Sequence, residues 1–79
     1  MHEANFTPLL EMHQLERASD WLRTLSHPVR LRIVQLLIRN QFSVGELATE
    51  CDIQNHMASE HLRLMQRAGL LVSRRSGRK

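Results

Sequence analysis

Polar side chains able to donate or accept hydrogen bonds recur between residues 54 and 63, spaced so that they share one face of a helix. The amides of Gln54 and Asn55 can pair bidentately with adenine, and the Glu60 carboxylate can accept a hydrogen bond from cytosine. The Arg63 guanidinium, further along, suits a phosphate group. The whole set is Gln54, Asn55, His56, Ser59, Glu60 and Arg63. Its chemistry favours contact with a DNA groove, and the alternative is an ordinary solvated helix face.

Two short helices joined by a tight turn would hold this polar face. Ser43 and Glu46 complete an S-x-x-E capping box, which starts the first of these helices. Asp52 fits the turn because aspartate tolerates left-handed backbone angles better than most residues. Gly69 stands where the C-cap glycine of the second helix is expected. Residues 43–68 therefore have the pattern of a helix-turn-helix, whose second helix enters a DNA major groove.

A long amphipathic helix is predicted over residues 7–25. Thr7 can cap it, and Pro8 suits its first position. Its apolar stripe is wider than a small core requires, so we expect part of it to contact another subunit. The residues expected at this dimer interface are Leu10, Leu15, Ala18, Trp21 and Leu22.

The most apolar helix is predicted from Val29 to about Arg39, and we therefore expect it to be central. Ser26 is its expected N-cap. Asn40 is expected to end it in a left-handed conformation, because asparagine is the commonest substitute for glycine there.

The segment 70–79 resembles half of a β-hairpin. Residues 70–75 read as a strand, and Ser76 with Gly77 reads as a hairpin turn. The sequence stops where a return strand would begin, so that strand is either missing or supplied by another chain. Four cations flank the turn and are expected to contact the DNA backbone or minor groove: Arg74, Arg75, Arg78 and Lys79.

The length of 79 residues predicts one small domain, residues 1–79. The net charge is only +3, but every Asp and Glu lies before His61, and six Arg or Lys follow it. Such clustering fits a polyanionic partner, although a solvated basic tail would have the same composition. No secretory signal or long apolar run is present, so a cytoplasmic protein without a membrane partner is expected. No nucleophile–base pair, paired carboxylates or Gly-rich phosphate loop is present, so we expect no enzyme.

Five histidines and one cysteine do not combine into a metal site. His56 and His61 are five positions apart, on different sides of a helix, and cannot share one ion. The neighbouring acids Glu50 and Asp52 would disfavour a thiolate at Cys51, so a structural thiol is expected. We therefore expect no metal and no cofactor.

Four motifs carry a resemblance to a known family: Leu25-Ser26-x-Pro28-x-Arg30, Val44-x-Glu46-Leu47-Ala48, Ser59-x-His61-Leu62 and Ala68-Gly69-Leu70. Together they resemble the ArsR/SmtB family of winged-helix transcriptional repressors over about residues 15–79. The resemblance implies a cytoplasmic homodimer that binds operator DNA and releases it when an inducer arrives. Metal-sensing members place cysteines where this sequence has Ser43 and Gly45, so that ligand set is missing.

The expected fold is thus mainly α, a winged helix-turn-helix of four helices followed by a truncated β-wing. The expected function is that of a sequence-specific regulator of transcription on double-stranded DNA, a homodimeric repressor without a metal site and with an unidentified inducer. The alternative is a winged-helix module for protein or RNA contacts, because a fold does not by itself fix a function.

Overall fold

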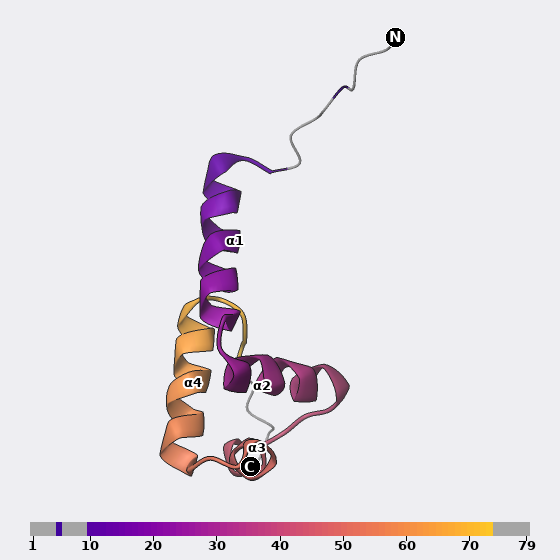
Figure 1. Ribbon diagram of the computed structural model, residues 1–79, viewed down its shortest axis with the longest axis vertical. Coiled ribbons are helices and arrows are strands. Elements are labelled where there is room, and N and C mark those ends of the chain that lie inside the picture. Colours follow the sequence, from indigo (N-terminus) through magenta and orange to yellow (C-terminus); the bar gives the residue numbers. More distant parts are fainter. Residues whose placement is uncertain (1–4, 6–9, 74–79) are drawn as a thin grey trace.

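The computed structural model describes residue 5 and residues 10–73. Four helices follow one another along this part of the chain: α1 (Met12–Leu25), α2 (Pro28–Arg39), α3 (Val44–Cys51) and α4 (Asn55–Arg67). Helix α1 projects away from the other three helices (Figure 1). The prediction of a mainly α domain of four helices is confirmed.

Helix α1 begins at Met12, later than predicted. Glu11 is its N-cap, and the backbone N–H of Glu11 donates to the side chain of Gln14 at 2.9 Å. This local hydrogen bond gives the backbone N–H of Glu11 an acceptor and fixes the start of the helix. The helix was predicted to start at Thr7, but Leu10 and Glu11 are not helical, so this part of the prediction is wrong. Residues 7–9 lie outside the described residues.

Helix α2 begins at Pro28, and its cap is His27 rather than Ser26. The Nδ1 atom of His27 accepts a hydrogen bond from the backbone N–H of Val29 at 3.1 Å. The predicted left-handed cap at Asn40 is also wrong, because Asn40 is extended. Its side chain accepts instead from the N–H of Gln41 at 3.0 Å.

The local signals of the helix-turn-helix are confirmed. Ser43 and Glu46 form the reciprocal capping box of α3, with hydrogen bonds of 2.8 and 3.1 Å. Asp52 ends α3 in the left-handed region, at φ 57° and ψ 48°. The backbone N–H of Ile53 then donates to the carbonyl of Ala48, which closes the turn before α4.

The core lies where α2, α3 and α4 meet. Ile33, Leu47 and Met65 are fully or almost fully buried, one from each of these helices. Helix α2 packs against α1, α3 and α4, so it is central as predicted. Its apolar residues exceed what so small a core covers, and Leu31 and Ile38 are exposed.

Helix α4 ends in a Schellman motif. Gly69 has a φ of 83°, its N–H donates to the carbonyl of Gln66, and the N–H of Leu70 donates to the carbonyl of Met65. The C-cap glycine is thus confirmed. The strand predicted over 70–75 is not formed in its described part, 70–73, because no partner strand is present among the described residues to complete a ladder. The predicted turn at Ser76 and Gly77 lies outside the described residues.

Replacing Gly69 by alanine is expected to lower the free energy of unfolding by about 1–2 kcal/mol, because a Cβ is disfavoured at positive φ. Space is not the cause, since an added Cβ would lie 3.8 Å from Trp21 Nε1, an ordinary contact distance. Urea unfolding followed by circular dichroism measures the change.

Gly45→Ala is the matched control. Gly45 lies inside α3, and a Cβ added there would be 4.0 Å from the Ser43 Oγ, an ordinary contact distance. Alanine there is expected to stabilise the protein by about 0.5–1 kcal/mol. Equal effects of the two substitutions would contradict the assigned backbone of Gly69.

Candidate nucleic-acid interface

The polar face of α4 is open to solvent. Ala58 and Met65 are completely buried on the opposite side of the helix, which packs against α3 and α2. Five of the residues predicted to contact DNA from this segment are exposed: Gln54, Asn55, His56, Glu60 and Arg63. The sixth, Ser59, is half-buried. The apolar residues thus direct one side of α4 inward and leave the other side available to a partner.

The N-terminus of α4 lacks a side-chain cap. Gln54 is the N-cap residue, and its side chain makes no capping hydrogen bond. The leading N–H groups of the helix therefore remain available, and the helix dipole makes this end electropositive. An anionic partner such as a phosphate would be favoured at this point.

A hollow of about 450 Å³ adjoins the polar face of α4. Ser59, Arg63 and Gln66 line it from α4, and Ser43 lines it from the cap of α3. Within residues 10–73, Arg63 has no carboxylate partner; the ion pair found there joins Asp20 and Arg23. Among the described residues, no carboxylate therefore forms an ion pair with the Arg63 guanidinium. The sequence predicts Ser43 only as a helix cap, whereas the fold places Ser43 beside α4.

The basic residues predicted to act at the wing lie outside the described residues. They are Arg74, Arg75, Arg78 and Lys79.

A cluster of basic side chains ties α4 to the junction of α1 and α2. Arg30 Nη1 lies 3.2 Å from His61 Nδ1, and Arg30 Nε donates to the backbone carbonyl of Thr24. The His27 ring packs beside His61, with their centroids 4.7 Å apart. His61 therefore packs and hydrogen-bonds at this junction. Arg30 and His61 both belong to the motifs quoted above, but sequence reasoning did not pair them.

The stability of the protein is expected to fall as the pH drops below about 6.5, the ordinary pKa of histidine. Burial lowers the pKa of His61, with further lowering by His27 and Arg30 and an opposing effect of Glu60. Because the folded state holds the proton of His61 less tightly than the unfolded state, the contribution of His61 to the free energy of unfolding is complete above its unfolded pKa. That contribution is lost as the pH falls through the lowered folded pKa of His61. The urea concentration at the midpoint of unfolding, determined between about pH 8 and pH 5, measures this loss of stability.

His61→Gln is expected to flatten that pH dependence, since the amide can still accept from Arg30 but does not titrate. His13→Gln is the control, because His13 is exposed on α1. An unchanged pH profile in His61→Gln would contradict this role of His61.

Cys51 is half-buried and lies near the core cluster. Burial raises the pKa of its thiol, Arg32 lowers it and Glu50 raises it. Over the described part of the chain, no group of three or more His, Cys, Asp or Glu side chains is placed to hold a metal ion. Among the described residues, no helix is long enough and apolar enough to cross a membrane.

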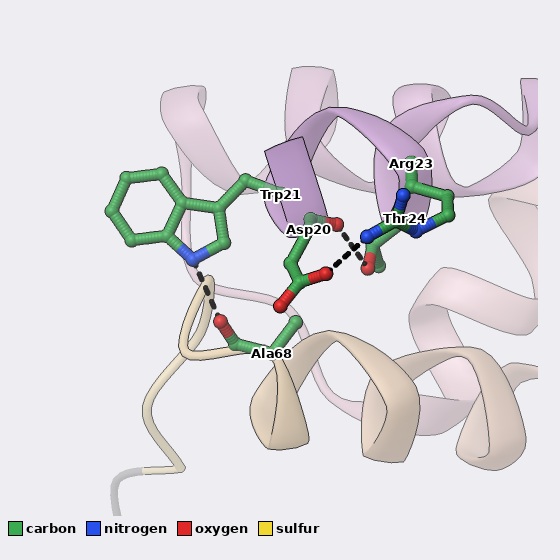
Figure 2. A network of polar contacts seen from close by, with 5 residues as sticks. All are labelled: Asp20, Trp21, Arg23, Thr24 and Ala68. Atoms are coloured by element: carbon green, nitrogen blue, oxygen red, sulfur yellow. Dashed lines mark hydrogen bonds and ion pairs between the residues drawn. The ribbon is translucent and has the colours of Figure 1, made fainter. Parts of the chain in front are cut away.

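The residues predicted for a dimer interface lie on or next to α1, which has no buried residue. Leu10, Leu15 and Leu22 are exposed. Ala18 and Trp21 are half-buried. Trp21 is directed toward its own subunit, where its indole N–H donates to the carbonyl of Ala68 at 2.7 Å (Figure 2).

Comparison with known proteins places this arrangement among bacterial regulators. Residues 25–74 match a family described as a helix-turn-helix domain. The chain is 34% identical over 76 residues to a biofilm growth-associated repressor of Xylella fastidiosa. The matched region covers 91% of this chain and 67% of that protein. It is 38% identical over 64 residues to the HTH-type transcriptional repressor SmtB of Mycobacterium tuberculosis, covering 81% and 47% of the two chains.

A third similar protein is the transcriptional activator HlyU of Vibrio cholerae, 33% identical over 54 residues, covering 68% of this chain and 50% of HlyU. The chain spans about half the length of most of the curated relatives it matches.

Proposed function

The chain belongs to the ArsR/SmtB family of helix-turn-helix transcriptional regulators, and on this premise we propose that it is a homodimeric repressor that binds a specific site on double-stranded DNA. The partners are then an operator duplex and a second copy of the chain, and the protein acts in the cytoplasm without a metal of its own.

The observation that carries the proposal is the two-sided character of α4. Ala58 and Met65 are fully buried on one side, while Asn55, His56 and Arg63 are exposed on the other. A helix anchored in this way can enter a major groove without losing its own core contacts. The uncapped N-terminus of α4 adds a favourable site for a phosphate.

The exposed apolar residues of α1 support the homodimer. Leu15 and Leu22 are seven positions apart, so they lie on nearly the same side of the helix. Each of these two residues is at least 45% exposed. Burial of this stripe against the same helix of a second copy would remove it from water. A two-fold dimer would also present two α4 helices to the two halves of a palindromic site.

Repression rather than activation is supported by the names of two of the similar proteins, a biofilm growth-associated repressor and the repressor SmtB. A third is named an activator. The direction of control is therefore a separate experimental question from DNA binding. The DNA contacts expected of Arg74, Arg75, Arg78 and Lys79 belong to the same proposal as the contacts of α4.

The test is selection of bound sequences from a pool of random duplexes by the purified protein, followed by a reporter assay with the selected site. We expect one palindromic sequence whose half-sites are about one helical turn apart, and a reporter that is lowered by the protein. Enrichment of no duplex, together with retention of RNA or a protein partner, would favour the alternative module. A raised reporter would make the protein an activator.

A further inference from the structure

The indole of Trp21 connects the end of α1 to the end of α4. Figure 2 shows the ring directed at the turn that follows α4, where its N–H meets the carbonyl of Ala68. The last carbonyls of a helix need partners from outside the helix. Those of Met65 and Gln66 accept from the N–H groups of Leu70 and Gly69. The Ala68 carbonyl obtains its partner from α1.

Neighbouring contacts hold the indole and its part of α1 in place. The guanidinium of Arg17 lies 5.5 Å from the centre of the Trp21 ring, over its face. Next to Trp21, Asp20 pairs with Arg23, and the Thr24 hydroxyl donates to the Asp20 carbonyl at 2.8 Å (Figure 2). The donor therefore comes from an ordered stretch of helix.

We propose that Trp21 is a positioning residue for DNA binding, whose hydrogen bond to Ala68 sets the angle between α1 and α4. This inference rests on the proposed function, in which α1 pairs the two subunits and α4 enters the groove. In such a dimer, the angle between α1 and α4 determines the distance between the two recognition helices. Trp21 would thus control which half-site spacing the protein accepts, without touching DNA.

The geometry makes DNA binding sensitive to this angle. Helix α4 has 13 residues and is therefore about 20 Å long. A tilt of about 10° around its C-terminal end would move its N-terminus by roughly 3.5 Å, which is about one base-pair step. The residues expected to contact bases lie at that far end, Asn55 and His56 among them. If the C-terminal end of α4 were loosely attached, the protein would therefore accept a wider range of half-site spacings.

The experiment compares the unmodified protein with Trp21→Phe and with a chain carrying benzothienylalanine at position 21, which keeps the shape of the indole but lacks its N–H. Affinity is measured for the selected palindrome, for palindromes with one base pair added or removed, and for a single half-site. Both variants are expected to bind the selected palindrome roughly three- to tenfold more weakly, the range of one hydrogen bond. The preference of both variants for the selected palindrome over the palindromes with altered spacing should be lost. Their affinity for a single half-site should be unchanged.

Ile33→Val is the control for lost stability, because it disturbs the buried core without touching Trp21. It is expected to keep the spacing preference. Sedimentation of each variant tests the alternative role. A Trp21→Phe protein that becomes a monomer would show that Trp21 packs the dimer and would overturn the positioning role.

The two proposals fail in different ways. An unmodified chain that binds no duplex would overturn both the proposed function and the role of Trp21. A chain that binds its palindrome, with an unchanged spacing preference in the benzothienylalanine protein, would overturn the role of Trp21 alone.

Discussion

Asn55→Ala is expected to weaken binding to the selected operator by roughly 5- to 150-fold, the effect of losing one bidentate contact to a base. Asn55 is exposed at the first position of α4, where residues of a recognition helix reach base edges. The loss should be confined to operators that carry the preferred base at one position, because other sequences do not offer that contact. Titration of matched duplexes that differ at single base pairs measures both affinity and preference.

Arg63→Ala is the matched control for Asn55→Ala. Arg63 is exposed on the same face of α4, about two turns further along, and is expected to contact a phosphate. Its loss should weaken binding to all duplexes alike and reduce the slope of log K against log salt by about 1. If both substitutions leave binding unchanged at low salt, α4 does not enter a groove.

Ile33→Ala is expected to lower the free energy of unfolding by about 2–5 kcal/mol, which is a large part of the stability of a domain of this size. Ile33 has no exposed surface and joins Leu47 and Met65 in the core. Truncation would leave a cavity between α2, α3 and α4, where few other residues are available to fill it. Urea unfolding at a fixed protein concentration measures the change.

Ile38→Ala provides the control with the same change of side chain in the same helix. Ile38 is 77% exposed, so its truncation should alter stability by no more than about 0.5 kcal/mol. A large effect of Ile38→Ala would show that this side chain is covered in solution, and the two measurements together test the orientation of α2.

Features that depend on a few neighbouring residues could be predicted from the sequence. The capping box of Ser43 and Glu46 closes within one helical turn, and the left-handed backbone of Asp52 and the positive φ of Gly69 reflect preferences of those residue types. These signals placed α3, its turn and α4. The helical spacing of Asn55, His56 and Arg63 also predicted which side of α4 is exposed.

Two local predictions were wrong because two acceptable signals competed. Thr7 with Pro8 and Glu11 with Gln14 both offer a start for α1, and the structure uses the second pair. Ser26 and His27 both offer a cap for α2, and the imidazole of His27 accepts the hydrogen bond. The N-cap preference of serine does not override Pro28, which begins α2 and leaves His27 as the residue directly before the helix.

The contacts that join distant parts of the chain could not be predicted in this way. Trp21 and Ala68 are 47 positions apart, and Arg30 and His61 are 31 apart. A helix pattern shows that Trp21 is on an apolar stripe, but it does not show whether the indole faces a second subunit or its own.

The sequence alone therefore determined the helices, the inward side of α4 and the polar residues on its outward side, because these follow from hydrogen bonds and spacing within a few turns. The tertiary structure decided how α4 is held: Trp21 at its C-terminal end, Arg30 at its middle, and Ser43 of α3 beside its polar face. Those contacts arise only when the helices pack around Ile33, Leu47 and Met65, since burial of these side chains sets the position of each helix relative to the others.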